Sequence, residues 1–247
     1  MIGSATPPIR GIIESSLTHW AGRIVAVVFV GGCNLRCGKC PSPHLITNAR
    51  EQGEIPLDSV LDAIYRRRRW IDGVVIKGGE PLLNPEVLEL LELLRDFGLQ
   101  IRIDTNGTCP EALSEIVRRD LTDFVSMEIK APLTDLYHRV AGTVVDLGSV
   151  FDSIGILLSG EVDYEFRTVV YDDLLGSEEV LAIARTIQGA RRYVLRAVQG
   201  RGPTRTNLRR LARLAGRHVE ACHVDGRPQD RETLFEVFAD GDERMNV

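Results

Sequence analysis

Residues 24–40 read IVAVVFVGGCNLRCGKC, an apolar run followed by two glycines and three closely spaced cysteines. The run from Ile24 to Val30 has the length and β-branched content of a fully buried strand. Gly31 and Gly32 permit a tight turn out of that strand. The loop that follows, at the strand end where α/β barrels carry their active sites, holds Cys33, Cys37 and Cys40.

Strand-length apolar runs recur along the chain, and helix-like segments lie between most of them. The runs span residues 24–29, 74–76, 101–103, 124–129, 162–170 and 193–198. Helices are indicated after Pro56, Pro85 and Pro110, from a cap at Ser177, and over 208–214. Such alternation implies parallel strands joined by right-handed crossovers. We therefore expect an α/β fold over residues 1–224, a TIM-like barrel or partial barrel. Its short N-terminal extension, residues 9–17, would form an additional edge strand.

The composition is that of an ordinary globular protein: 247 residues, 44% hydrophobic and 26% charged, with a formal net charge of −5. The longest apolar run is far shorter than the roughly 20 residues of a membrane-spanning helix. The N-terminus has neither a basic leader nor an apolar core, so we expect a cytoplasmic protein. The mild acidity gives no reason to expect nucleic acid or a membrane as a partner. Residues 225–247 are more polar and predict a docked helix followed by a frayed end.

The basic residues are unevenly divided between the two common types. Of the 30, 27 are arginine and only three are lysine: Lys39, Lys77 and Lys130. The run Arg66–Arg69 predicts a solvated helix end, because arginine is favoured at the negative pole of the helix dipole. A docking patch for an acidic partner is the alternative.

Three of the five cysteines fall within eight residues, a spacing that composition alone makes improbable. In a reducing compartment such a group is more often metal-binding or catalytic than disulfide-bonded. Three thiolates can hold three corners of a four-iron four-sulfur (4Fe-4S) cubane and leave the fourth iron open to a substrate. Zinc is the alternative, since His44 lies four residues after Cys40 and would complete a closed structural site. A fortuitous group of buried thiols is the third explanation.

The spacing Cys-x-x-x-Cys-x-x-Cys after the first strand resembles the signature of the radical S-adenosylmethionine (SAM) superfamily. The resemblance implies a partial (β/α)6 barrel of the radical SAM type, with a 4Fe-4S cluster whose open iron binds the amino and carboxylate groups of SAM. It also implies that one electron cleaves the sulfonium and releases a 5′-deoxyadenosyl radical. The cofactors would supply the difficult chemistry, and the protein would supply orientation and electrostatics.

Further segments match the same superfamily. Residues 77–81 read KGGEP and look like its Gly-Gly-Glu-Pro motif. Glycines there let the backbone approach the cofactor, and the glutamate can accept hydrogen bonds from an ammonium. The segment DTNG at 104–107 and the segment EIK at 128–130 end the third and fourth strands of the expected barrel. The alternative interpretations are a turn for the first two segments and a solvated charge pair for the third.

The resemblance assigns cofactor contacts to the matching positions. Those positions are Lys39, Gly78, Gly79, Glu80, Asp104, Thr105, Glu128, Lys130, Arg167 and Arg196. In related activating enzymes the segments around Asp104 and Glu128 also surround a monovalent cation, although an aspartate is usual where this chain has Glu128. Lys39 stands where an aromatic residue usually precedes the last cluster cysteine. For Arg196 an outward, solvated side chain is the alternative.

Within the superfamily the closest resemblance is to activating proteins of anaerobic ribonucleoside-triphosphate reductase, over about residues 9–222. It implies abstraction of a glycine hydrogen from a partner glycyl radical enzyme, with a low-potential electron donor such as a flavodoxin or ferredoxin. Only Cys109 and Cys222 lie outside the cluster, too few for a second four-cysteine cluster. Two alternatives stay open: a radical enzyme acting on a small-molecule or nucleotide-derived substrate, and a non-catalytic zinc or iron–sulfur binding module.

Overall fold

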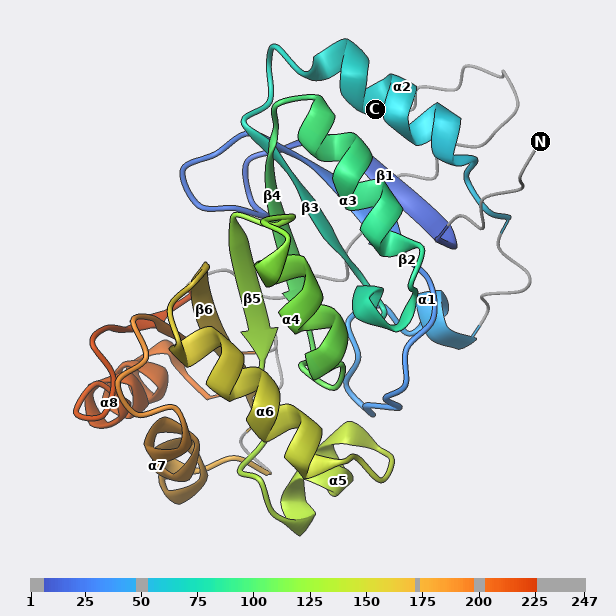
Figure 1. Ribbon diagram of the computed structural model, residues 1–247. Helices are drawn as coiled ribbons and strands as arrows, with labels where there is room; N and C mark the ends of the chain where they lie inside the picture. The colour runs from blue at the N-terminus through green and yellow to red at the C-terminus, as the bar shows by residue number, and fades with distance from the viewer. Residues whose placement is uncertain (1–6, 48–52, 172–173, 198–202, 226–247) are drawn as a thin grey trace.

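The computed structural model describes residues 7–47, 53–171, 174–197 and 203–225, which form a single eight-stranded sheet with helices packed on its outer face (Figure 1). The strands follow one another in chain order: β1 Ile9–Ser16, β2 Val25–Val30, β3 Gly73–Gly78, β4 Gln100–Thr105, β5 Phe124–Glu128, β6 Asp163–Val170, β7 Tyr193–Ala197 and β8 Cys222–Val224. Only β1 is antiparallel to its neighbour, and the other neighbouring pairs are parallel.

The expected α/β partial barrel is therefore confirmed, and so is the N-terminal edge strand. One strand was missed, because β8 spans only Cys222–Val224 and such a short segment has no detectable hydrophobic period. Among the described residues β8 pairs with β7 alone, so β1 and β8 are the two edges and the barrel does not close. The docked helix predicted after residue 225 lies outside the described residues.

Helices connect successive strands at nearly every crossover. They are α1 His44–Thr47, α2 Leu57–Arg67, the 3-10 turn η1 Pro81–Leu83, α3 Val87–Asp96, α4 Pro110–Arg118, α5 Asp135–Ala141, α6 Leu147–Leu158, α7 Ser177–Thr186 and α8 Arg205–Ala215. Of the helices in the described ranges, none is both long enough and apolar enough to cross a membrane.

Helices α5 and α6 were not predicted. The sequence of α6 contains Gly148 and Gly155, which weaken the helical signal. Asp146 nevertheless caps it, because its Oδ1 accepts a hydrogen bond from the Gly148 N–H at 2.9 Å. At α7 the predicted cap is one residue off: Gly176 precedes the helix, and the Glu179 carboxylate accepts from its N–H at 2.7 Å.

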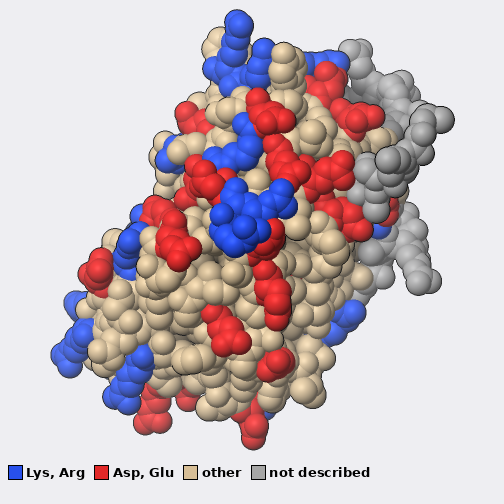
Figure 2. All heavy atoms as spheres, viewed as in Figure 1, with Lys and Arg blue, Asp and Glu red and all other residues tan. Residues whose placement is uncertain are grey.

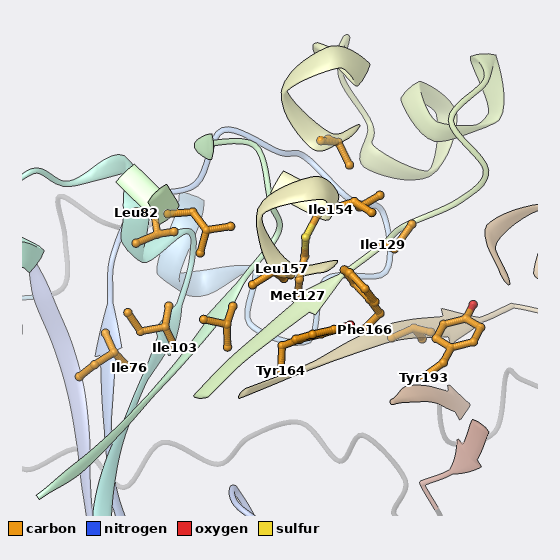
Figure 3. Packing of buried hydrophobic residues seen from close by; sticks show 14 of the residues in the cluster. Ile76, Leu82, Ile103, Met127, Ile129, Ile154, Leu157, Tyr164, Phe166 and Tyr193 are labelled. Carbon is orange, nitrogen blue, oxygen red and sulfur yellow. The ribbon is translucent and has the colours of Figure 1, made fainter. Parts of the chain in front are cut away.

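Alternate residues of the strands build two apolar layers. Ala26, Val28 and Val30 of β2 face the large cluster between sheet and helices, which Figure 3 shows around Ile76, Ile103 and Leu157. Val25, Val27 and Phe29 face the inside of the barrel, in a second cluster with Trp20, Val75 and Phe124. Because β2 is buried on both faces, the loop that follows it begins from a rigid base.

We predict that Leu94→Ala lowers the free energy of unfolding by about 2–5 kcal/mol, because it opens a cavity in the outer layer. Leu94 of α3 has no exposed surface. Leu17→Ala is the matched control, since that leucine is 72% exposed and its truncation should change stability by no more than about 0.5 kcal/mol. Chemical denaturation measures both values, and equal losses would contradict the assignment of this layer as the core.

Candidate functional site

A cavity of about 740 Å³ opens at the carboxyl ends of the parallel strands and extends into the barrel. Of the thirteen site residues that the sequence singled out, twelve line it. They are Cys33, Cys37, Lys39, Cys40, Gly78, Gly79, Asp104, Thr105, Glu128, Lys130, Arg167 and Arg196. The exception is Glu80, which is completely buried beneath the cavity wall.

The cluster loop, residues 31–43, is fixed at its start by the Gly-Gly-Glu segment. The N–H of Gly79 donates to the Val30 carbonyl at 2.9 Å, and the N–H of Glu80 donates to the Gly32 carbonyl at 2.8 Å. A Cβ on Gly79 would overlap the Gly32 carbonyl oxygen, and Gly78 has a φ of +129°, which other residues rarely adopt. Both glycines are thus required by the close approach of two backbones.

The same loop is held further along by two contacts that the sequence did not reveal. The N–H of Arg36 donates to the Ala141 carbonyl at 2.8 Å, and a Cβ on Gly142 would overlap the Arg36 carbonyl. The amide of Asn34 donates to Thr108 Oγ1 at 2.8 Å and accepts from Asn106 Nδ2 at 3.1 Å. These partners come from distant elements, so only the folded chain brings them together.

The buried Glu80 side chain lies behind the cavity wall and forms hydrogen bonds to the residues that line it. Its carboxylate accepts hydrogen bonds from Thr105 Oγ1 at 2.7 Å, from the Asn106 N–H at 2.6 Å and from the Leu82 N–H at 3.2 Å. Burial raises the pKa of Glu80 to about 7, although these donors and the Lys130 ammonium oppose the rise. Through its two carboxylate oxygens, Glu80 therefore links the segment after β3 to the end of β4 and the residues that follow it.

Asp104 lies between two guanidinium groups inside the barrel. Its Oδ1 pairs with Arg102 Nε and its Oδ2 with Arg167 Nη2, both at 2.7 Å. Glu165 completes the group by accepting from Arg102 Nη2 at 3.0 Å and from Ser126 Oγ at 2.8 Å. Burial opposes ionisation, but the two guanidinium charges hold the pKa of Asp104 far below its usual range. Asp104 is thus an anion, and Arg167 points inward.

A second pair lies nearer the cysteines. Lys130 Nζ contacts Glu128 Oε1 at 2.8 Å. Against the effect of burial, each partner stabilises the charge of the other, so the pKa of Glu128 is lowered and that of Lys130 is raised. Glu128 and Asp104, the two carboxylates predicted beside a monovalent cation, are therefore both paired with basic side chains.

Lys39 and Arg196 each have a partner on the cavity wall. The Lys39 ammonium lies 4.5 Å from the centre of the Tyr171 ring, a cation–π contact. Tyr171 follows β6, lines the cavity and was not predicted. Arg196 Nη2 pairs with Asp225 Oδ2 at 2.7 Å, so Arg196 faces the cavity and not the solvent.

The three cysteines fit an iron–sulfur cluster better than a single zinc ion. All three line the cavity, whereas His44, the proposed fourth zinc ligand, does not. A zinc ion needs its ligands within about 2.0–2.3 Å of one point. Among the described residues no three His, Cys, Asp or Glu side chains have such an arrangement. In a cubane each cysteine binds a different iron, so the side chains can stand further apart.

Burial raises the pKa values of the Cys33 and Cys37 thiols, and the Lys130 ammonium opposes both rises. These thiols would therefore release protons as a cluster binds.

The Arg66–Arg69 run lies at the end of α2, and three of its four side chains contact other residues of the chain. Arg66 pairs with Asp62 at 2.5 Å, Arg67 pairs with Glu14, and Arg68 donates to the Tyr65 carbonyl at 2.8 Å. Figure 2 shows basic and acidic side chains intermixed over the helical face. These contacts favour the interpretation as a solvated helix end.

Comparison with known proteins identifies the superfamily. Residues 27–171 match the radical SAM superfamily, and the chain belongs to it. The chain is 24% identical over 229 residues to a putative glycyl-radical enzyme activating enzyme of Methanocaldococcus jannaschii, covering 86% of this chain and 93% of that protein. It is 35% identical over 139 residues to the pyruvate formate-lyase-activating enzyme of Clostridium pasteurianum, covering 54% and 57% of the two chains.

Two further proteins are similar to this chain. The 7-carboxy-7-deazaguanine synthase of Methanopyrus kandleri is 30% identical over 132 residues, which is 46% of this chain and 52% of that protein. Among solved structures, TYW1 with a lysine-pyruvate adduct bound superimposes with a TM-score of 0.60 at 15% identity, covering 84% of this chain and 78% of that one. At that identity the likeness concerns the fold.

We predict that Gly79→Ala prevents assembly of the iron–sulfur cluster while the sheet still folds. The added methyl group cannot fit against Gly32, so the cluster loop has to move away from the cavity. Iron and sulfide analysis after anaerobic reconstitution measures the effect, and circular dichroism measures the fold. Gly155→Ala is the control, because a Cβ there meets nothing within 4 Å. Full cluster content in Gly79→Ala would contradict this account of the loop.

Asp104→Asn should destabilise the protein by about 1.5–3 kcal/mol, since it removes one of the two carboxylates that Arg102 and Arg167 share and leaves them only Glu165. The exposed pair of Glu115 and Arg118 supplies the control, and Glu115→Gln should cost no more than about 1 kcal/mol. The pKa of Asp104 is lower in the folded protein than the value of about 3.9 expected in the unfolded chain. Its charge therefore stabilises the folded state fully above about pH 3.9, and this stabilisation is lost only as the pH falls towards the folded-state pKa.

The loss of unfolding free energy caused by Asp104→Asn should therefore be the same at every pH between about 6 and 8, as measured by urea denaturation. A loss that grows across this range would show that another group is responsible.

Proposed function

We propose that this radical SAM protein is an activating enzyme that abstracts the α-hydrogen of a glycine in a partner glycyl radical enzyme. The main support is the similarity to the putative activating enzyme of M. jannaschii, which extends over 86% of this chain. The open edges of the described sheet agree with such a substrate, because a loop of a second protein could reach the cavity between β1 and β8.

The residues on the cavity wall have separate roles in this proposal. Cys33, Cys37 and Cys40 would hold the 4Fe-4S cluster, and Lys130 would bind the SAM carboxylate beside them. When bound, the cluster and SAM supply a 5′-deoxyadenosyl radical by one-electron cleavage of the sulfonium. Transfer of one hydrogen atom from the glycine to that radical would yield 5′-deoxyadenosine and a glycyl radical. The electron would come from a low-potential donor such as a flavodoxin or ferredoxin.

A radical reaction on a small molecule is the second candidate. The similarity to 7-carboxy-7-deazaguanine synthase supports it, although that alignment covers 46% of this chain. The barrel serves both kinds of substrate, so the choice depends on the loops and on the partner.

We expect the reconstituted protein, given SAM and a strong reductant, to produce a glycyl radical signal in electron paramagnetic resonance on a glycyl radical enzyme encoded beside it. Cys40→Ala should abolish the signal, because it removes one cluster ligand. Cys222→Ala, a change in β8 outside the cavity lining, should retain it. Formation of 5′-deoxyadenosine without any glycyl radical would refute the activase assignment and favour the small-molecule reaction.

A further inference from the structure

One side-chain amide of the cavity wall lies within hydrogen-bond distance of a cluster cysteine. Asn106 follows β4, lines the cavity and has 6% of its surface exposed. Its Nδ2 donates to Cys33 Sγ at 3.9 Å, a long contact because sulfur is larger than oxygen. The Leu35 N–H donates to the same sulfur at 3.4 Å. Cys33 Sγ thus receives hydrogen bonds from two N–H groups of the protein.

The orientation of the Asn106 amide is determined by Thr108. Asn106 Oδ1 accepts hydrogen bonds from the Thr108 N–H at 3.0 Å and from Thr108 Oγ1 at 2.6 Å. A backbone N–H only donates, so the amide atom that it contacts is the oxygen. The NH2 group of the amide therefore lies on the opposite side, where it faces Cys33 and Asn34.

Asn34 closes a ring of hydrogen bonds with these two side chains. Its Oδ1 accepts from Asn106 Nδ2 at 3.1 Å, and its own Nδ2 donates to Thr108 Oγ1 at 2.8 Å. The Thr108 hydroxyl then donates to Asn106 Oδ1, which completes the ring. The NH2 group of Asn106 has two hydrogens. One belongs to the ring, and the other is directed to the Cys33 sulfur.

The main chain that carries Asn106 is held by buried groups. Its N–H donates to Glu80 Oε2 at 2.6 Å, and the N–H of Gly107 donates to Thr105 Oγ1 at 3.1 Å. Gly107 has a φ of +76°, and a Cβ there would overlap the Met127 side chain. The amide is therefore fixed at its backbone as well as at both ends of its side chain.

We propose that Asn106 raises the reduction potential of the 4Fe-4S cluster by donating a hydrogen bond to the Cys33 thiolate. Asn34 and Thr108 would act as positioning residues, because they hold the amide in its orientation. Reduction adds one electron, so the cluster becomes more negative. A hydrogen-bond donor to a ligand sulfur stabilises that state and so raises the potential. Burial of the amide strengthens the effect, because little water is present to screen it.

This role goes beyond the proposed function, because both candidate reactions start from the reduced cluster. A higher potential makes reduction of the cluster by an electron donor easier. The same electron then passes to SAM with a smaller driving force. Asn106 would therefore set the balance between these two steps, whichever molecule gives up the hydrogen atom.

A redox titration followed by electron paramagnetic resonance tests the proposal on the reconstituted protein without SAM. Titanium(III) citrate supplies the one electron that each cluster takes up. Asn106→Leu keeps a branched side chain but has no N–H donor. It should lower the reduction potential by about 30–60 mV, which is a three- to tenfold smaller equilibrium constant at about 59 mV per tenfold. Asn207→Leu, on the exposed side of α8, is the matched control and should leave the potential unchanged.

Thr108 provides a second test, since it is not among the described residues that line the cavity. Thr108→Val removes the hydroxyl of the ring and should lower the potential by a smaller amount. Thr108→Ser keeps the hydroxyl and should have the wild-type potential. This pair decides the question if Asn106→Leu assembles no cluster, and equal potentials in the two Thr108 variants would then refute the proposal.

An unchanged or higher potential in Asn106→Leu with full iron and sulfide content would overturn the proposal. A lower cluster content with an unchanged potential would show that Asn106 only supports the cluster loop. Weaker SAM binding in equilibrium dialysis, again with an unchanged potential, would assign the amide to the cofactor instead. None of these results depends on a glycyl radical signal, so this inference and the activase assignment can fail independently.

Discussion

The backbone of Gly78 and Gly79 lies against the backbone of Val30 and Gly32, with no space for a side chain between them. This close approach sets the height of the cluster loop above the sheet, because the loop starts from the turn that Gly79 touches. Glu80 also fixes the end of the next strand, β4, relative to this turn, since its buried carboxylate accepts hydrogen bonds from Thr105 and Asn106. Asn106 in turn contacts Asn34 in the cluster loop. Three strand ends are thereby held in one fixed arrangement.

The ion pairs inside the barrel differ from those on its outer helices in their exposure to water. Inside, Asp104 pairs with the buried Arg102 and Arg167, and Glu128 forms a partly buried pair with Lys130, so in both groups each partner stabilises the charge of the other. On the outer helices, pairs such as Arg118 with Glu115 are hydrated and contribute little to stability. The inner pairs therefore determine where a ligand charge can be accommodated, whereas the outer pairs can be exchanged with small effect.

The sequence predicted the features that depend on local pattern. The strand before Cys33, the Gly-Gly-Glu turn and the helix that starts at Pro110 all follow from short-range signals, and the structure has them where expected. The role of Glu80 beneath the wall, the Tyr171 ring against Lys39 and the Arg36 contact with Ala141 depend on residues far apart in the chain. No single-sequence pattern specifies such contacts. Short β8 and the glycine-containing α6 were missed because their local preferences are weak.

The placement of every lysine in the cavity also determines the character of the exterior. The positive charge there belongs to arginine, whose guanidinium keeps its proton at any pH that the protein survives. An ammonium, in contrast, can be acetylated or can lose its proton at high pH. Enzymes that modify lysine side chains therefore find no target on the outer surface of this chain. The basic charge available to docking partners is permanent, and the amines that can change their charge are confined to the site of chemistry.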